Sequence, residues 1–180
     1  CGEGYYTSRL LQALTAEGRE AEVYGVDVAK RAVQYAAGRD KAIRFAVAST
    51  YHLPIQDDSI DLLLCIFAPR DEGEFARVLK EAGRLIVAAP GPRHLRSLRE
   101  IIYSEPEDIG SRGDVGGNFA LLDQVKVTYP ISIDTTQDIH KLLTMTPYGK
   151  HADGVALAKL NELTRLETEI DINIFVYGRS

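Results

Sequence analysis

The stretch that decides the fold is residues 1–10, CGEGYYTSRL. Two glycines, Gly2 and Gly4, precede a segment whose apolar residues recur at helical spacing over residues 5–16. A glycine turn that opens a helix leaves backbone N–H groups available to a ligand. In α/β proteins such a turn follows a hydrophobic strand, whereas this sequence begins at the turn. The glycine pair alone is equally typical of an ordinary tight turn.

An acidic residue strengthens the ligand interpretation. Residues 22–29 predict a short buried strand ending at Asp27, 23 residues after Gly4. An acid in that position can accept hydrogen bonds from both ribose hydroxyls of a nucleoside; the alternative is a helix cap. Thr7 stands where the GxGxxG fingerprint requires a third glycine, so the pyrophosphate signature is incomplete. The pattern therefore favours a nucleoside without phosphates, and S-adenosylmethionine is such a ligand.

Predicted strands and helices alternate in the first half of the sequence. The strands are 22–29, 43–49, 59–69 and 84–91, and the helices are 5–16, 30–38 and 72–83. This alternation predicts a mostly parallel sheet with helices on both faces. The second half predicts helices over 93–103, 135–144 and 154–163, a mobile glycine-rich loop over 104–118, and long strands over 122–132 and 164–178. The two long strands are expected to form an antiparallel edge.

The composition is that of one globular domain. The 180 residues are 45% hydrophobic and 26% charged. Neither Cys1 nor Cys65 has a CxxC partner, so these residues predict no zinc knuckle or disulfide framework and fit a reduced, cytoplasmic setting. No apolar run has the length of a membrane span, so no membrane partner is expected. The net charge of -5 argues against a protein that coats nucleic acid non-specifically, but it is compatible with a local basic patch.

Several short motifs together resemble the large-subunit (23S) rRNA guanine-N1 methyltransferases of the RlmA type. The motifs are CGEGYYT (1–7), GVDVAK (25–30), FAVAS (45–49), LP (53–54), IFAP (66–69), PGPRHL (90–95) and MTP (145–147). CGEGYYT and PGPRHL are specific, whereas the other motifs occur in many methyltransferases. The resemblance covers nearly the whole chain. It implies a methyltransferase catalytic domain over residues 1–180, with a Rossmann-like class I S-adenosylmethionine-dependent fold.

Members of this family extend further at the N-terminus. They carry a four-cysteine zinc ribbon and then a strand that leads into CGEG. The resemblance therefore implies that the chain is N-terminally incomplete, that the first, central strand of the sheet is missing, and that zinc is expected only in the missing region. Because the strands beside the missing one lose a ladder of hydrogen bonds, we expect such a fragment alone to be unstable or to expose a sticky groove.

The resemblance also assigns residues to the cofactor. They are Gly2, Glu3, Gly4, Asp27, Ala48, Ser49, Phe67 and His94. The first three are expected under the methionine part, Asp27 at the ribose, and Ala48 with Ser49 beside the adenine. Phe67 is expected where the target base and the methyl group meet, and His94 is expected to contact the cofactor from PGPRHL. The ordinary alternatives are a solvated acid for Glu3, core packing for Phe67 and a structural role for His94.

Basic and aromatic residues are candidates for RNA contacts. Arg93, Arg96 and Arg99 recur at spacing three and predict one basic helix face. Arginine pairs with phosphate through two parallel hydrogen bonds, so this face is a candidate rRNA-binding surface; a solvated helix face is the alternative. The aromatic candidates for stacking on an extruded base, or for simple packing, are Tyr5, Tyr6 and Tyr148.

The implied activity is S-adenosylmethionine-dependent methylation of a guanine N1 in large-subunit rRNA. Guanine N1 carries a proton that has to leave, but spacing marks none of Glu3, His52 and His94 as the base, so the catalytic residue is unassigned. Two other functions stay open: a small-molecule methyltransferase of the same fold, and a non-catalytic cofactor-binding module. The sequence does not identify the target guanine or the oligomeric state, for which a homodimer stays open.

Overall fold

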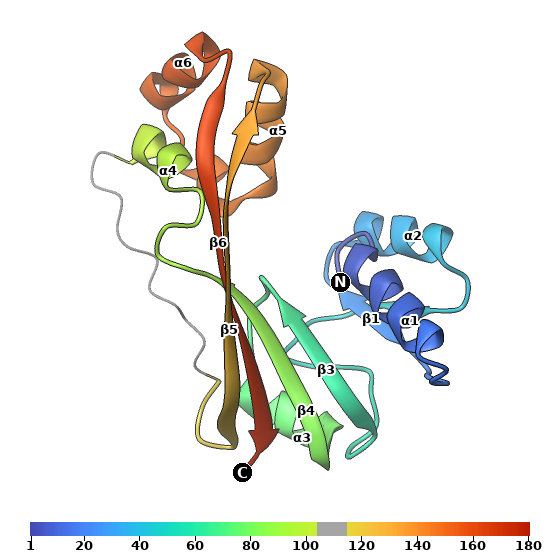
Figure 1. Ribbon diagram of the computed structural model, residues 1–180. Helices are drawn as coiled ribbons and strands as arrows, with labels where there is room; N and C mark the ends of the chain where they lie inside the picture. Colours follow the sequence, from blue (N-terminus) through green and yellow to red (C-terminus); the bar gives the residue numbers. More distant parts are fainter. Residues whose placement is uncertain (104–114) are drawn as a thin grey trace. The chain divides into compact units, whose positions relative to one another are not determined.

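The computed structural model describes residues 1–103 and 115–180 (Figure 1). In chain order the elements are α1 (Tyr5–Ala16), β1 (Tyr24–Asp27), α2 (Lys30–Arg39), β2 (Arg44–Val47), β3 (Ile60–Ile66), α3 (Glu72–Val78), β4 (Leu79–Pro90), α4 (Arg96–Ile102), β5 (Phe119–Ile133), α5 (Thr136–Met145), the 3-10 helix η1 (Pro147–Lys150), α6 (Gly154–Glu162) and β6 (Leu166–Arg179). Most of the loop predicted over 104–118 lies outside the described residues. The order of strands and helices follows the sequence prediction.

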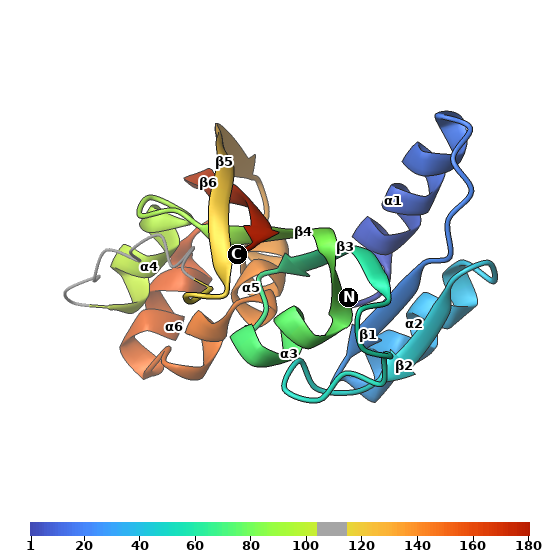
Figure 2. The same ribbon diagram turned by 90° about the horizontal axis from the view of Figure 1, so that it is seen from below.

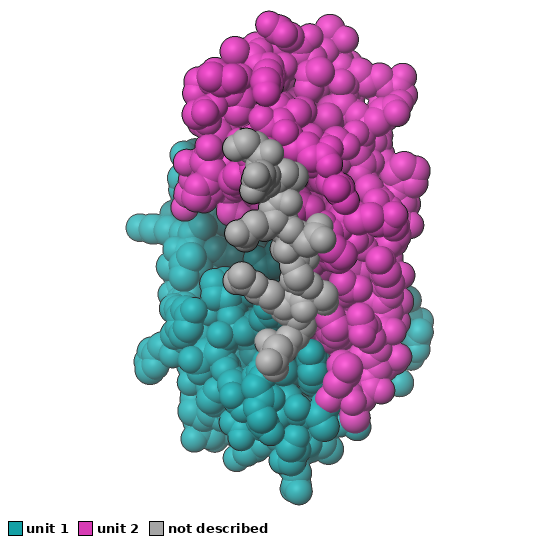
Figure 3. All heavy atoms as spheres, turned by 90° about the vertical axis from the view of Figure 1, so that its left-hand side faces the viewer, with its two compact units in different colours: residues 1–86, 115–120, 177–180 teal, residues 87–114, 121–176 magenta. Residues whose placement is uncertain are grey.

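The chain forms two compact units, which Figure 3 shows in different colours. Unit 1 comprises residues 1–86, 115–120 and 177–180, and unit 2 comprises residues 87–114 and 121–176. Three strands, β4, β5 and β6, have residues in both units. The glycine turn and Asp27 therefore belong to unit 1, whereas the whole PGPRHL segment belongs to unit 2.

The first strands of unit 1 form a parallel pair. β1 pairs with β2 from Tyr24 opposite Arg44 to Asp27 opposite Val47. Parallel neighbours need a crossover connection, and α2 supplies it, packing along both strands (Figure 2). The face of α2 that is buried carries Val33 and Ala36. This arrangement places Asp27 at the carboxyl end of its strand, as predicted.

The single sheet expected from the sequence is divided into two. β1 and β2 form one sheet, and the other has the strand order β3-β4-β6-β5. Among the described residues, no strand joins β1 or β2 to the four-stranded sheet. The expected pairing of the last two long strands is confirmed, since β5 and β6 are neighbours with their arrowheads at opposite ends in Figure 1.

The helix predicted over 72–83 is too long. α3 ends at Val78, and residues 79–83 begin β4. From Gly83 onward buried and less buried residues alternate along β4, and Leu79, Leu85 and Val87 are almost fully buried. Burial of one face therefore outweighs the helix propensity of the intervening lysine, glutamate and alanine.

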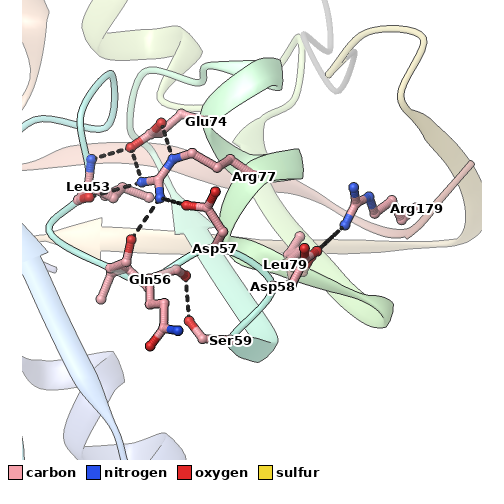
Figure 4. A network of polar contacts seen from close by, with 10 residues as sticks. Leu53, Gln56, Asp57, Asp58, Ser59, Glu74, Arg77, Leu79 and Arg179 are labelled. Atoms are coloured by element: carbon pink, nitrogen blue, oxygen red, sulfur yellow. Dashed lines mark hydrogen bonds and ion pairs between the residues drawn. The ribbon is translucent and has the colours of Figure 1, made fainter.

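A network around Arg77 of α3 holds the segment between β2 and β3 (Figure 4). The Arg77 guanidinium donates to the carbonyl oxygens of Leu53 (3.0 Å) and Ile55 (2.8 Å). It also pairs with the carboxylates of Asp57 (2.5 Å) and Glu74 (2.6 Å). The Leu53 N–H donates to Glu74. One arginine thus satisfies backbone groups of the segment that follows Ala48 and Ser49.

Glu74 should make the stability of this network depend on pH. The hydrogen bond from Arg77 is the main cause that lowers the pKa of Glu74 from 4.5 to about 2, although burial opposes it. A carboxyl with a lowered pKa stabilises the fold in its charged form. Its contribution is complete above pH 4.5 and is lost as the pH falls towards 2. We expect Glu74→Gln to lower the free energy of unfolding at pH 7 by about 1–3 kcal/mol and to flatten its fall over this acidic range, measured by urea unfolding.

The matched control for this prediction is Glu81→Gln, at an exposed position of β4 in the same unit. It should leave both the stability at pH 7 and the acid limb close to those of the parent protein. If the free energy of unfolding fell equally with acidification in the Glu74 variant and the parent, the charged carboxylate would have no stabilising role.

Unit 2 has its own hydrophobic core. Eight buried side chains form it: Leu95, Leu98, Ile102, Ile139, Leu143, Tyr148, Leu160 and Leu166. They come from α4 and the turn before it, from α5, η1 and α6, and from the start of β6. Because Leu95 is only 2% exposed, the core of unit 2 anchors the end of the PGPRHL segment.

Candidate functional site

The glycine turn is bound to the carboxylate of Asp27. The Gly2 N–H donates to Asp27 Oδ2 (2.8 Å), and the Ala29 N–H donates to Oδ1 (2.9 Å). The amino nitrogen of Cys1 lies 3.1 Å from Oδ2 and 2.7 Å from the carbonyl oxygen of Val26. Asp27 therefore fixes the turn against the carboxyl end of β1 and also shapes the start of α2.

The two glycines of the turn have different roles. Both have left-handed backbones, with φ of 54° at Gly2 and 77° at Gly4. A Cβ on Gly4 would lie 2.9 Å from the Cβ of Ala36 and 3.2 Å from the Phe45 ring, whereas a Cβ on Gly2 would meet nothing within 4 Å. Gly4 thus allows α1 to start close against α2 and β2, and Gly2 is the glycine with space for a ligand.

The Asp27 carboxylate is held in its charged form. Burial raises its pKa, but the hydrogen bonds from the N–H groups of Ala29 and Gly2, together with the hydrogen bond and charge of the Cys1 amino group, outweigh that effect, so the net pKa lies below the ordinary value. Its side chain is 24% exposed. Each carboxylate oxygen can accept about two hydrogen bonds, and Oδ1 accepts only the one from Ala29, so Oδ1 has capacity for a further hydrogen bond from a ribose hydroxyl.

Ala48 and Ser49 follow β2, beside Asp27. The Ala48 N–H donates to the carbonyl oxygen of Asp27 (3.1 Å), and Ser49 Oγ accepts from the N–H of Tyr51 (3.2 Å). Ser49 also forms an isolated β-bridge with His52. The structure thus brings Gly2, Asp27 and Ala48 together at the carboxyl ends of two parallel strands. Open α/β folds bind ligands at this edge.

Phe67 follows β3 and does not pack in the core. It is 49% exposed and has φ of 49°, an uncommon conformation for a bulky residue. Such backbone conformations gather at functional sites. Because Phe67 is exposed, the core-packing alternative for this residue is wrong.

Glu3 is also exposed, which fits both the cofactor interpretation and the solvated-acid alternative.

His94 belongs to unit 2. Its Nδ1 accepts a hydrogen bond from the backbone N–H of Asp171 (3.3 Å), and the ring is partly buried. Burial lowers the pKa of His94, the charge of Arg99 lowers it further, and Asp171 opposes both. These effects together favour the neutral form of the ring.

The prediction of one basic helix face is wrong. α4 begins at Arg96, so Arg93 lies before the helix, where its guanidinium pairs with Glu169 (3.2 Å). Arg99 is only 2% exposed and donates to the carbonyl oxygens of His94 (3.2 Å) and Pro92. Backbone carbonyls left without partners by the irregular turn explain why an arginine is buried there.

The aromatic candidates differ in exposure. Tyr5 and Tyr6 are 52% and 55% exposed, and their rings meet edge to face at 5.2 Å. Tyr148 is buried in the core of unit 2 and meets Tyr103 edge to face. Packing is thus the role of Tyr148, whereas Tyr5 and Tyr6 are exposed, with the Arg9 guanidinium over the Tyr5 ring at 5.7 Å from its centroid.

Sequence reasoning missed Asp171, a fully buried carboxylate in β6. A signal was present, because Asp171 shares its strand phase with Asn173, Phe175 and Tyr177, and all four are buried. A polar residue in the buried phase of a strand needs partners.

Among the described residues, no group of three or more His, Cys, Asp or Glu side chains is arranged to hold a metal ion. The described helices include none with the length and apolarity of a membrane span.

The glycine turn and Asp27 lie at the carboxyl edge of a parallel strand pair, which is the edge at which open α/β folds bind ligands. The family model described as "Methyltransferase domain" matches residues 1–146. The chain therefore belongs to this methyltransferase-domain family. Solved structures agree on the fold: YcgJ of Bacillus subtilis has a TM-score of 0.60 at 22% identity, covering 99% of this chain and 89% of that one. Geranyl diphosphate C-methyltransferase from Streptomyces coelicolor A3(2) has a TM-score of 0.54 at 15% identity, covering 100% of this chain and 71% of that one.

Two curated relatives are similar in sequence. "Putative 23S rRNA (guanine-N(1)-)-methyltransferase YxjB" of Bacillus subtilis (strain 168) is 29% identical, over 98% of this chain and 64% of the relative. "23S rRNA (guanine(748)-N(1))-methyltransferase" of Streptomyces fradiae is 35% identical, over 88% of this chain and 56% of the relative. The chain thus spans about three fifths of the length of these relatives.

Proposed function

We propose that this chain is the catalytic part of an S-adenosylmethionine-dependent methyltransferase that acts on a guanine N1 of large-subunit rRNA. The observation that carries the proposal is the agreement of two relatives, each named for guanine-N1 methylation of 23S rRNA, along 98% and 88% of the chain. The CGEGYYT and PGPRHL motifs support the same substrate. An rRNA substrate also fits the cytoplasmic location expected from the sequence.

The described residues of unit 1 suit the cofactor. Asp27 offers a charged carboxylate for the ribose hydroxyls, Gly2 leaves open space, and Ala48 follows β2 next to Asp27. When bound, S-adenosylmethionine supplies a methyl group on a sulfonium, which needs only a correctly oriented nucleophile. The contribution of the protein is to hold the two reactants in line and to exclude water.

The rRNA substrate can be tested in the cell. We expect deletion of the gene from its source organism to remove one N1-methylguanosine from large-subunit rRNA, measured by mass spectrometry of rRNA digests. Complementation with the intact gene should restore the nucleoside, and complementation with the Asp27→Ala variant should not. An unchanged set of rRNA modifications after deletion would overturn the proposed substrate.

A small-molecule substrate is the second candidate, and one observation favours it. The basic helix face expected to contact RNA is absent, because Arg99 is buried and Arg93 is paired with Glu169. Arg96, the third arginine of that set, is exposed and pairs with Glu100, and the net charge of the chain is -5. Purified full-length protein that transfers methyl groups to a small metabolite, but not to rRNA fragments, would establish this function instead. Cofactor binding without any transfer would instead support a non-catalytic binding module.

A further inference from the structure

Two helices of unit 1, α1 and α2, carry positive charge and no negative charge. The only charged residue of α1 is Arg9, and those of α2 are Lys30, Arg31 and Arg39. Neither helix contains an aspartate or a glutamate, although the whole chain has a net charge of -5. All four helix cations are exposed. Such a local excess of cations in an acidic chain indicates a surface for a negatively charged partner.

The charge of the four helix cations is not neutralised by the described part of the chain. No carboxylate in residues 1–103 and 115–180 forms an ion pair with any of them. The Arg9 guanidinium contacts neutral groups, namely the Tyr5 ring and Gln12 Oε1 (3.3 Å). By contrast, Arg44 of β2 in the same unit pairs with Glu22 at 3.4 Å. The helix cations can therefore attract a partner outside the chain.

The cations of α2 line up with an aromatic ring. Arg31, Tyr35 and Arg39 recur at spacing four, so they lie on one face of the helix, and all three are exposed. The buried residues of α2, Val33 and Ala36, lie on the opposite side. The face ends at a pocket that Arg39 lines together with residues of α1 (Figure 1). The basic face of α2 thus continues into a pocket shared with α1.

The pocket between α1 and the end of α2 contains more positive than negative groups. Its lining residues are Tyr5, Ser8, Arg9, Gln12, Arg39 and Asp40. Asp40 is the only acid among them, and its Oδ1 accepts from the backbone N–H of Ala42 (3.0 Å). Arginine guanidinium groups bind phosphate oxygens through paired hydrogen bonds. Two arginines on one pocket therefore suit a phosphate group.

The exposed aromatic residues of these helices favour RNA over other anionic partners. Tyr5, Tyr6 and Tyr35 are 52%, 55% and 61% exposed. Cations interleaved with exposed aromatic rings are the combination that binds unpaired nucleic acid, because phosphates pair with the cations and bases stack on the rings. A helix that lies on an anionic membrane needs a continuous apolar face. The exposed side of α2 instead includes Gln34 and Gly38.

We propose that the α1–α2 surface, defined by Arg9, Arg31, Tyr35 and Arg39, binds an unpaired stretch of the RNA substrate. A backbone phosphate occupies the pocket between Arg9 and Arg39, and a base stacks on Tyr35. This inference rests on the proposed function for the identity of the RNA as large-subunit rRNA. The surface lies wholly within unit 1.

The first test measures RNA binding by the full-length protein. The probe is an unmodified in vitro transcript of the large-subunit rRNA of the source organism, and filter binding at several salt concentrations gives Kd. We expect the combined Arg9→Gln, Arg39→Gln variant to bind about tenfold to a hundredfold more weakly at about 0.1 M salt. Each lost phosphate contact should also reduce the slope of log affinity against log salt concentration by about 0.7.

The matched control is Arg44→Gln, which removes the same charge from an arginine of the same unit that pairs with Glu22. It should bind the transcript as the parent does. Asp40→Asn removes the acid of the pocket and should strengthen binding about twofold. If Arg44→Gln weakened binding as much as Arg39→Gln, net charge and not the pocket would be the cause, and the inference would be wrong.

The second test separates stacking from charge. Tyr35→Ala should weaken binding about tenfold and leave the salt slope unchanged, because a stacked ring releases no counterions. Every variant should keep the thermal unfolding curve and the S-adenosylhomocysteine affinity of the parent, which shows that the surface has not unfolded. Unchanged RNA affinity in Tyr35→Ala and in the Arg9, Arg39 variant would overturn the inference. Loss of binding to phosphatidylglycerol vesicles only would overturn it in favour of a membrane surface.

Failure of the inference differs from failure of the proposed function. If deletion of the gene removes one N1-methylguanosine while the variants bind the transcript as the parent does, the α1–α2 surface alone is wrong. If the variants lose RNA affinity while deletion leaves rRNA modification unchanged, the surface stands and the proposed methylation target is wrong. A parent protein that does not bind the transcript would overturn the inference.

Discussion

Replacing Gly4 with alanine should lower the free energy of unfolding by about 2–5 kcal/mol. A left-handed backbone costs a residue with a Cβ roughly 1–2 kcal/mol, and inserting a carbon into a packed contact costs about 1–3 kcal/mol. Both penalties apply here, because φ is 77° and the new Cβ would lie 2.9 Å from the Cβ of Ala36. Urea unfolding of the full-length protein, followed by circular dichroism, measures the loss.

The matched control is Gly38→Ala in α2 of the same unit. A Cβ at Gly38 would meet nothing within 4 Å, and the position is helical. Alanine should therefore raise stability there by up to about 1 kcal/mol, because glycine is the poorer helix former. If both substitutions changed stability equally and in the same direction, the close packing of Gly4 against α2 would not be the cause.

Asp27→Ala should weaken S-adenosylhomocysteine binding about tenfold to a hundredfold. The proposed ribose contact would lose a hydrogen bond to a charged acceptor, worth roughly 1.5–3 kcal/mol, and every 1.4 kcal/mol is about tenfold in affinity. The substitution also releases the Gly2 N–H, which bonds to Asp27 Oδ2 at 2.8 Å, so the turn loses its anchor. Calorimetric titration of the full-length protein with S-adenosylhomocysteine measures the effect.

Asp40→Asn is the control for this experiment. The Asp40 carboxylate accepts from the N–H two residues later, at 3.0 Å, as Asp27 does, but it does not contact the glycine turn. We expect the Asp40 variant to bind with the affinity of the parent. If both variants lost affinity equally, Asp27 would act only through local backbone structure. If both variants kept the affinity of the parent, Asp27 would not contact the ribose.

Most elements of the fold could be predicted from local patterns. The helical spacing before Gly18 predicted α1 with the bounds that the structure has, and short apolar runs predicted β1, β2 and β3. These signals are local, because a period of 3.6 or 2 residues is contained within the element itself. The start of β4 was mispredicted, since residues 79–83 read as helix until the neighbours that bury Leu79 are known.

The candidate site was predictable in part, for the same reason. Gly2, Gly4 and Asp27 follow a recurrent spacing in which turn, helix and strand end are linked by short connections. Arg99 and Asp171 had no such spacing. Arg99 was expected on a surface and is buried against the carbonyl oxygen of His94, and Asp171 bonds to Arg93, 78 residues away. A contact of that separation leaves no periodic signal in either segment.

The sequence by itself determined the element order, the glycine turn and the acid at the end of β1, because backbone preferences and side-chain periodicity act over a few residues. Only the tertiary structure decided that Gly4 serves packing while Gly2 leaves open space, that the sheet is divided, and that Asp171 binds the PGPRHL segment. Each of these depends on which distant groups share a buried space, where every polar atom requires a partner and every added carbon requires room.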